Sequence, residues 1–490
     1  MANIQSLATE LFQIIAAQLS VKDRKSLRFV NKRLCSQVTP LIFSGVVISN
    51  VPGSDWKIEM LKYIADPEGV APWAHTATFH FSYCRDESES DVRKLLPSAL
   101  KNFTRVQIFK LYMYSYIPDW TYDIVLSSLA ELPHLTDLWI RAHRPNLPRS
   151  MCPPLPFHLL ESLKTLRCIR ISIGDVRGSQ YAERVIFHPL RTFLCHSNVR
   201  DLTISLKTDV SDVQMPSIHE FLPEPGSSAL QLENLELEGF ITDMPLGLPP
   251  SLRDLKRLVM GPDSKLGNIW KCFETNRVQL QELVVSCDGS PFDKGLMSYL
   301  SSYSGLQVLH LNFWLLYSKP SRSPDLDRLR RDTAQALYNE VVPRQKTTLR
   351  VLTLTWPTRR WCLQPAYLNG LRSCENLEVL CVVVAQNDIV DRNILAELFE
   401  VAANMPKLGL LCLSVYVKST VDIDNGGLKQ RIRGTKIRAP SSREVTPLYL
   451  QLIKPDWVFR LRNVDDGWFF RFAPVLPRTI KPDSVHMIHL

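Results

Sequence analysis

The stretch Leu132-Pro133-His134-Leu135-Thr136-Asp137-Leu138-Trp139-Ile140 contains the pattern that decides the fold of this chain. An apolar residue is followed by two others, a second apolar residue, one other and a third apolar residue. The last two apolar positions alternate as in a strand with one buried face. The pattern occurs eleven times, at steps of 23 to 43 residues: Phe103/Val106/Ile108, Leu135/Leu138/Ile140, Leu166/Ile169/Ile171, Val199/Leu202/Ile204, Leu232/Leu235/Leu237, Leu255/Leu258/Met260, Leu280/Leu283/Val285, Leu306/Leu309/Leu311, Leu349/Leu352/Leu354, Leu377/Leu380/Val382 and Leu408/Leu411/Leu413.

Apolar residues at helical spacing lie between these copies. They predict helices over Asp391 to Ala403 and Leu326 to Val341, and shorter ones over Leu296 to Tyr303 and Pro216 to Leu222. A repeated order of strand, turn and helix is similar to the leucine-rich repeat. The resemblance implies an α/β solenoid with parallel strands on the concave face and helices outside. The asparagine that ladders inside regular leucine-rich repeats is mostly missing, so we expect irregular repeats.

The N-terminal residues predict a small helical unit. Ser20 with Asp23 three residues later is typical of a capping box that opens a second helix. We expect a bend near residues 30–31 to split that helix, and Pro40 to end the unit. A first helix is indicated by five apolar residues at steps of 4, 3, 1 and 4: Leu7, Leu11, Ile14, Ile15 and Leu19.

Residues 4 to about 44 resemble the F-box, on the stretches Ser6 to Asp23 and Ser26 to Leu34. That family begins with Leu-Pro-x-Glu-Leu/Ile, continues with Ile-x-x-x-Leu-Ser-x-x-Asp and ends with Leu-x-x-Val-Asn/Ser/Cys-Lys/Arg-x-Leu. This chain departs from the pattern at Ala8, where the family has proline, and at Arg24-Lys25, where it has an apolar pair. The alternative is an ordinary three-helix cap over the rest of the core.

An F-box followed by irregular leucine-rich repeats is a layout of fungal-type F-box proteins. The resemblance implies a non-catalytic substrate adaptor of a Skp–cullin–F-box ubiquitin ligase. Its partners would be a Skp-family adaptor, through it a cullin and RING ligase, and a protein target. An interaction scaffold whose F-box recruits no ligase is the alternative, motivated by Ala8. The residues expected to form the helical unit and its adaptor contact are Leu7, Ala8, Glu10, Leu11, Ile14, Ile15, Leu19, Leu27, Val30, Asn31 and Leu34.

The same patterns divide the chain into six segments. Residues 418–445 are polar and carry six Lys and Arg residues between 429 and 443, which favours an exposed loop. Apolar runs after this loop predict short strands that cap the last repeat. The expected segments are an F-box at 1–45, a transition at 46–72 with a first strand over Gly45 to Ser49, a solenoid at 73–417, the basic loop at 418–445, cap strands at 446–477 and a tail at 478–490.

Composition narrows the class of protein. The chain has 490 residues, 45% of them hydrophobic, and a net charge of +9, which excludes a mainly disordered chain and does not imply nucleic acid. Its 11 cysteines are odd in number and include no CxxC pair, which argues against a secreted disulfide framework. The N-terminus is not typical of a signal peptide, and no apolar run reaches membrane-spanning length. We therefore expect a cytoplasmic or nuclear protein without membrane contact.

No motif predicts catalysis or a cofactor. A phosphate loop, a nucleophile elbow and paired histidines at metal-binding helical spacing are all missing from the sequence. His75, His80 and Cys84 lie close together, but the run through residues 75–81 alternates like a strand and no fourth ligand is evident. We expect no bound metal.

The repeat also predicts where a target would bind. In each copy the residue between the last two apolar positions points away from the core. Residues further along the same strands, such as Arg141, Phe313 and Trp356, would lie on the same face. An exposed tryptophan on such a surface is a good anchor, although each tryptophan can instead pack over a neighbouring repeat. The basic loop could instead contact an acidic target, a phosphorylated degron or a nuclear-import factor, and the alternative is a solvated loop without a partner. It has no interleaved aromatic residues, which argues against single-stranded nucleic acid. The candidates for target binding are Trp139, Arg141, Glu236, His310, Phe313, Thr353 and Trp356.

Overall fold

The computed structural model describes most of the chain as two compact units. The first comprises Met1–Phe240 with Pro249–Asp254, and the second Ile241–Leu248 with Leu255–Leu490. The described residues are 8–49, 57–81, 86–113, 119–143, 155–174, 186–207, 215–223, 230–244, 247–261, 264–265, 267–288, 294–314, 324–355, 361–391, 393–416, 425–441, 447–453, 457–464 and 467–473.

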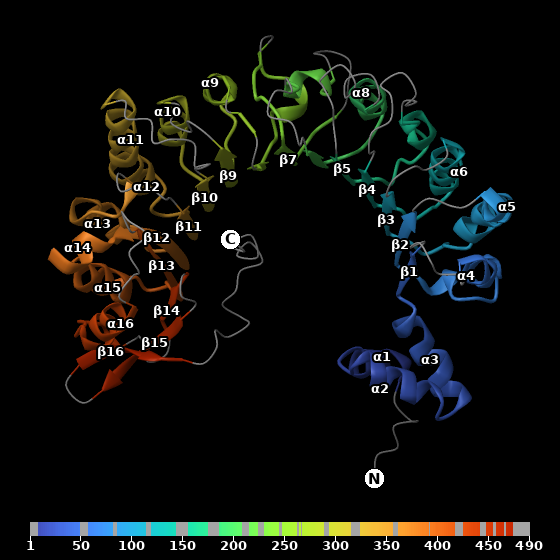
Figure 1. Cartoon of the computed structure of the whole chain (residues 1–490), viewed down its shortest axis with the longest axis horizontal. Coiled ribbons are helices and arrows are strands. Elements are labelled where there is room, and N and C mark those ends of the chain that lie inside the picture. The colour runs from blue at the N-terminus through green and yellow to red at the C-terminus, as the bar shows by residue number, and fades with distance from the viewer. Residues whose placement is uncertain are drawn as a thin grey trace. The chain divides into compact units, whose positions relative to one another are not determined.

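The first unit begins with three short helices, α1 (Thr9–Ala17), α2 (Val21–Arg28) and α3 (Lys32–Ile42) (Figure 1). Phe12 and Ala16 of α1 pack against Leu34 and Val38 of α3, and all four are nearly inaccessible to solvent. The amide of Gln37 donates to the hydroxyl of Thr9 at 3.0 Å and adds a polar contact between the same two helices. The core of these helices is therefore small.

Side-chain caps set the starts of α2 and α3. The Ser20 hydroxyl accepts a hydrogen bond from the Asp23 amide, as its capping pattern predicts. Asn31 accepts one from the Leu34 amide at 2.8 Å, so the predicted bend before residue 32 is confirmed. The expectation that Pro40 ends the unit is wrong, because Pro40 lies inside α3. The helix continues to Ile42, since a proline removes one amide and the Phe43 amide still reaches Thr39.

Seven strands of the first unit form a parallel sheet within the described residues, and the helices between them cover one face (Figure 1). In each unit, the face of the sheet opposite to the helices is the helix-free face (Figure 1). The strands are β1 (Gly45–Ser49), β2 (Thr76–Phe81), β3 (Ile108–Met113), β4 (Asp137–His143), β5 (Cys168–Gly174), β6 (Asp201–Leu206) and β7 (Asn234–Glu238). The helices are α4 (Lys57–Ala65), α5 (Asp86–Lys101), α6 (Asp119–Ala130) and α8 (His188–Cys195), with short 3-10 turns at Phe157–Leu160, Ile218–Glu220 and Pro250–Leu252.

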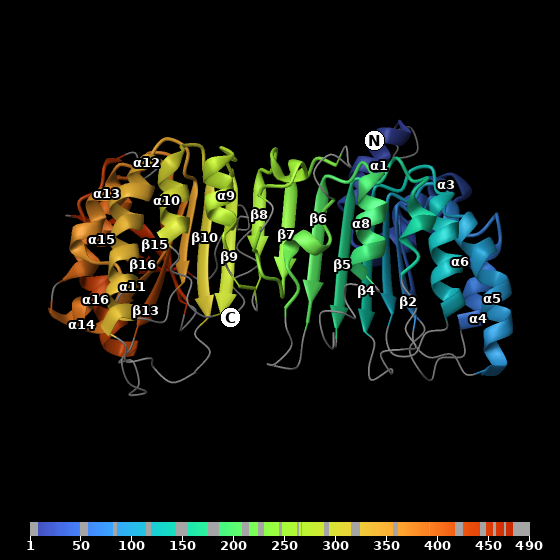
Figure 2. The same cartoon turned by 90° about the horizontal axis from the view of Figure 1, so that it is seen from above.

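The second unit continues the same alternation, and its strand arrows point the same way from β8 to β10 (Figure 2). Pairing is parallel from β8 to β14 and antiparallel in β14–β15–β16. The strands are β8 (Arg257–Met260), β9 (Glu282–Asp288), β10 (Val308–Trp314), β11 (Val351–Thr355), β12 (Val379–Ala385), β13 (Leu410–Tyr416), β14 (Tyr449–Leu452), β15 (Trp457–Val464) and β16 (Gly467–Phe472). The helices are α9 (Ile269–Thr275), α10 (Lys294–Ser302), α11 (Pro324–Ala336), α12 (Val342–Arg344), α13 (Leu368–Arg372), α14 (Gln386–Asp391), α15 (Ile394–Asn404) and α16 (Asn425–Gly434).

The strand register follows the sequence pattern in ten of its eleven copies. Within the first unit, the predicted core positions of β4 align with those of β5, β6 and β7, and within the second unit those of β8 align through to β13. The first copy is wrong, because Ile108 aligns with Asp137 and the buried positions of β3 are Phe109 and Leu111. Phe103 in the preceding turn is also buried, so its apolar character shifted the predicted pattern along the chain.

Helix predictions hold with shifted boundaries. The helix expected over 326–341 is α11 followed by a π-helical turn at Leu337–Val341, and the one expected over 216–222 shortens to a 3-10 turn. The segment expected as an exposed basic loop contains α16, so the loop expectation is wrong for residues 425–434. Leu428 and Ile432, one helical turn apart, are buried and fix this helix to the unit.

Candidate functional site

The N-terminal helices carry an unusual concentration of exposed apolar side chains. Among the described residues, six of the ten large apolar side chains that are exposed lie between positions 11 and 30. Single exposed apolar residues are common, whereas a concentration of them marks a surface that binds a partner. These six residues, the N-terminal apolar surface, are Leu11, Ile14, Ile15, Val21, Phe29 and Val30.

Helix α1 is apolar on two sides, and only one side packs within the chain. Phe12 and Ala16 point into the core, while Leu11, Ile14 and Ile15 follow helical spacing along another side. The exposed fractions of these three are 54%, 62% and 48%. A helix that only had to cover α3 would carry polar residues there, so the second apolar side points to a further partner.

The predicted adaptor-binding residues separate into three groups. Two of them, Leu19 and Leu27, are half-buried. Six are exposed: Ala8, Glu10, Leu11, Ile14, Ile15 and Val30. Leu34 is a core residue and Asn31 caps α3, so these two support the helices from inside. Leu7 lies outside the described residues. Sequence reasoning missed Val21 and Phe29, which stand at the first residue of α2 and just after its end, where helical spacing does not define a face.

The helix-free face of the first unit brings two predicted target-binding residues into one row. Strand register places one residue of each strand side by side across the sheet, and Trp139 and Glu236 both belong to this row. Arg141 is exposed in the adjacent row, next to Tyr112 and Ser172. The row contains Val47, Thr78, Lys110, Trp139, Arg170, Thr203 and Glu236.

Trp139 is held between two cations. The Lys110 ammonium on β3 lies 4.0 Å from the ring centroid, and the Arg170 guanidinium on β5 lies 4.5 Å from it. Such contacts are each worth about 0.5–1 kcal/mol at exposed sites. The indole is half-buried and its Nε1 has no hydrogen-bond partner among the described residues. Trp139 therefore positions two cations, and it is not an open platform for stacking.

The corresponding row of the second unit is buried from β8 to β13, which corrects the expectation for His310 and Thr353. Their exposed fractions are 7% and 3%, and β11 and β12 are buried at every residue. Both faces of these strands are covered, as continuous apolar runs such as residues 379–385 indicate. A cluster on the helix-free face comprises Val351, Val379, Cys381, Leu410, Cys412 and Tyr449. The side chain of Phe313 and all of Trp356 lie outside the described residues.

Burial changes the chemistry of His310. Desolvation lowers the pKa of its imidazole to about 4, while Glu282 acts to raise it and Arg257 to lower it. Nε2 has no hydrogen-bond partner among the described residues, and neither do the hydroxyls of the buried Thr353 and Thr355. The neutral imidazole is therefore the form that the folded chain holds at neutral pH.

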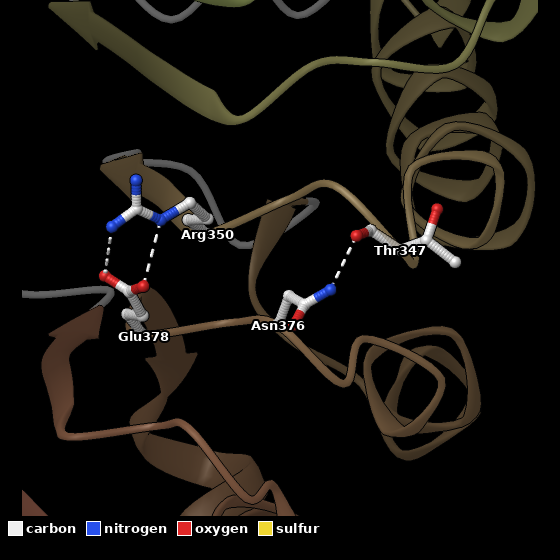
Figure 3. Close-up of polar contacts among 4 residues, drawn as sticks. All are labelled: Thr347, Arg350, Asn376 and Glu378. Carbon is white, nitrogen blue, oxygen red and sulfur yellow. Dashed lines mark hydrogen bonds and ion pairs between the residues drawn. The ribbon is translucent and has the colours of Figure 1, made fainter.

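Ion pairs and amide contacts join neighbouring strands where the strands begin. Arg350, which precedes β11, donates two hydrogen bonds to Glu378, which precedes β12, at 2.9 and 3.1 Å (Figure 3). Asn376 donates to the Thr347 carbonyl at 2.6 Å in the adjacent turn. These residues line an open hollow of about 330 Å³. Arg350, Glu378 and Asn376 are each engaged by a neighbouring repeat, which indicates a structural role for these contacts.

The cysteines of the described residues are buried or half-buried. No group of three or more His, Cys, Asp or Glu side chains in the described part of the chain has the arrangement of a metal site. Burial raises the pKa of the Cys168 and Cys374 thiols to about 11, so both stay protonated and are poor nucleophiles.

In comparisons with known proteins, neither a family model nor a curated protein matches this chain. Within the described residues, none of the helices combines the length and the apolar character needed to cross a membrane.

Proposed function

We propose that this chain is the substrate-recognition adaptor of a Skp–cullin–F-box ubiquitin ligase, with an F-box at its N-terminus and irregular leucine-rich repeats after it. The N-terminal apolar surface is the observation that carries the proposal. Four of its six residues, Leu11, Ile14, Ile15 and Val30, are positions that the F-box resemblance assigns to the adaptor contact. The chain itself leaves these side chains uncovered, and a Skp-family adaptor would bury them.

The backbone at Ala8 also supports an F-box. Ala8 is the N-cap of α1 with φ −57° and ψ 146°, and this φ is close to the value that a proline ring enforces. The residue therefore has the conformation of the family's proline without its ring. Adaptor docking would use the same backbone path and lose only the contact of the pyrrolidine ring.

The repeats would supply the surface for the target. The helix-free face of the first unit is mixed in character, with Trp139 between its two cations, the exposed Arg141 and the acidic Glu236. Polar and aromatic groups together are typical of specific protein interfaces. The adaptor would hold the target, and its cullin-bound partners would carry out ubiquitin transfer in the cytoplasm or nucleus.

The direct test is co-purification with a Skp-family adaptor. The double variant Leu11→Asp/Ile15→Asp places two charges in the apolar surface and should weaken adaptor binding at least 30-fold, since a central interface residue contributes about 2 kcal/mol or more. Val390→Asp is the matched control, because Val390 of the second unit is 54% exposed, like Leu11. Circular dichroism should show equal folding of both variants. Failure of the unmutated chain to bind the adaptor would refute the proposal.

A scaffold that binds the adaptor without joining a ligase is the second candidate, and Ala8 is the observation that favours it. A weaker dock would release the adaptor before cullin assembles. Reconstitution with adaptor, cullin and RING protein distinguishes the two. A stable complex that contains the cullin supports the ligase subunit, and an adaptor complex that excludes the cullin supports the scaffold.

A further inference from the structure

The C-terminal end of the chain concentrates its positive charge. Ten Lys and Arg residues and four Asp and Glu residues lie between positions 425 and 473, a net charge of +6 in a chain whose total is +9. Helix α16 and the hairpin β15–β16 contribute six of the ten cations, three each. A local excess of this size attracts a partner of opposite charge.

Three of these cations share the helix-free face of the hairpin. Arg460 pairs directly with Arg471 across the antiparallel ladder, and Arg462 pairs with Phe469 on the same face. The alternate residues Phe459, Leu461 and Phe470 are buried on the other face, so the arginines project away from the core. The cluster of Arg460, Arg462 and Arg471 is called the arginine cluster below.

The direct pairing of Arg460 with Arg471 is an unfavourable contact within the hairpin. Like charges directly opposite in an antiparallel pair, with Cβ atoms about 5 Å apart, destabilise a sheet. Among the described residues, none of the three guanidiniums has a hydrogen-bond or ion-pair partner, and the acidic residues nearest in sequence, Asp456, Asp465 and Asp466, lie outside them. A ligand with negative charge would compensate this repulsion.

Two aromatic rings hold the cluster in place and decide the kind of partner. Arg471 lies over the Phe469 ring at 5.3 Å, and Arg460 over the Tyr449 ring at 5.8 Å. These rings are engaged by guanidiniums and are not free to stack on nucleic-acid bases. Guanidinium forks, in contrast, match carboxylates with two parallel hydrogen bonds. The chemistry therefore favours an acidic peptide over a nucleic acid.

We propose that the arginine cluster binds an extended segment of the target in which acidic residues alternate with others. Arg460 and Arg462 are two residues apart on one strand, about 7 Å along it. Alternate side chains of an extended peptide have the same spacing, so its carboxylates would meet successive guanidiniums. This inference rests on the proposed function, because it names the class of target that the adaptor presents.

Fluorescence anisotropy with the full chain at 50 mM salt tests it. The probes are a labelled twelve-residue peptide of alternating Glu and Ser, its Gln counterpart, a peptide with six Ser followed by six Glu, and a twelve-nucleotide oligothymidylate. Arg460→Gln/Arg471→Gln should weaken binding of the alternating peptide at least tenfold and leave folding intact. Arg431→Gln/Arg433→Gln on α16 removes the same charge from exposed positions and should change binding less than twofold.

The outcomes of this experiment test the inference independently of the proposed function. Absent binding of the alternating peptide, equal losses in both double variants, or equal binding of the block peptide would overturn it. Tighter binding of the oligothymidylate through the same arginines would replace it with a nucleic-acid surface. Adaptor co-purification is measured on the unmutated chain and on the same variants, and it depends on the N-terminal apolar surface. An unmutated chain that binds the adaptor but not the alternating peptide refutes only the inference.

Discussion

Replacement of His310 by valine should remove a pH-dependent loss of stability from the second unit. His310 lies in a row with Val284 on one side and Thr353 on the other, and valine already occupies the adjacent position. The variant His310→Val thus places a similar volume in the row and deletes a buried ring nitrogen that has no partner among the described residues. We expect it to fold.

The magnitude follows from the pKa of the imidazole, which burial lowers from 6.5 to about 4. Between these values the unfolded chain binds a proton that the folded chain excludes, so stability falls as pH decreases from 6.5 toward 4. Each pH unit below 6.5 costs about 1.36 kcal/mol of unfolding free energy until the folded-state pKa is approached. The loss of stability is therefore about 2 kcal/mol at pH 5 and close to zero at pH 7.5. The Arg257–Glu282 ion pair is present in both proteins and cancels in the comparison.

Urea unfolding of the unmutated chain and of His310→Val at pH 7.5 and pH 5 measures the effect. The difference in unfolding free energy between the two proteins should grow by about 2 kcal/mol at the lower pH. Selective ¹⁵N labelling of histidine offers a direct check, because the His310 ring should stay neutral at pH 5. A difference that is equal at both pH values, or a ring that titrates near pH 6.5, would refute the burial argument.

Two further predictions concern the N-terminus and the strand edges. Ala8→Pro should stabilise the N-terminal helices by about 0.4–1 kcal/mol, since φ already fits proline, and a lower melting temperature of those helices would contradict this. The Arg350–Glu378 pair has exposed fractions of 54% and 41%, so a double-mutant cycle with Arg350→Gln and Glu378→Gln should give a coupling of about 1 kcal/mol or less that decreases in 1 M salt. A coupling above about 2 kcal/mol would show that the pair is more than a surface contact.

The repeat was predictable because its core residues obey a local rule. Leu138 and Ile140 are separated by one residue in sequence and lie on one face of a strand, so the pattern alone assigns their burial. The rule failed at the first copy, where Phe103 is buried by a turn and satisfies the same spacing. Outside the eleven copies, the first strand has the bounds expected for it, Gly45–Ser49.

Exposure on the opposite face was less predictable, because it depends on neighbouring strands. Trp139 and His310 occupy equivalent positions of the pattern, yet Trp139 is half-buried between cations and His310 is almost inaccessible. The residues beside them differ: charged in the first unit and apolar in much of the second. A single strand does not contain this information. The arginine cluster could not be predicted for the same reason, because Arg471 lies opposite Arg460 only in the register that β15 and β16 adopt.

The proposed binding surfaces share a physical property that argues for function. The N-terminal apolar surface exposes Leu11 and Phe29 where polar residues would cost nothing, and the arginine cluster opposes Arg460 to Arg471 where a neutral residue would be more stable. Where the strands begin, in contrast, a charged side chain is paired with the neighbouring repeat, as Arg350 is with Glu378. Sequences that fold well keep local and global preferences consistent and depart from them mainly at functional sites. These departures are therefore where partner binding, and not folding, best explains the choice of residue.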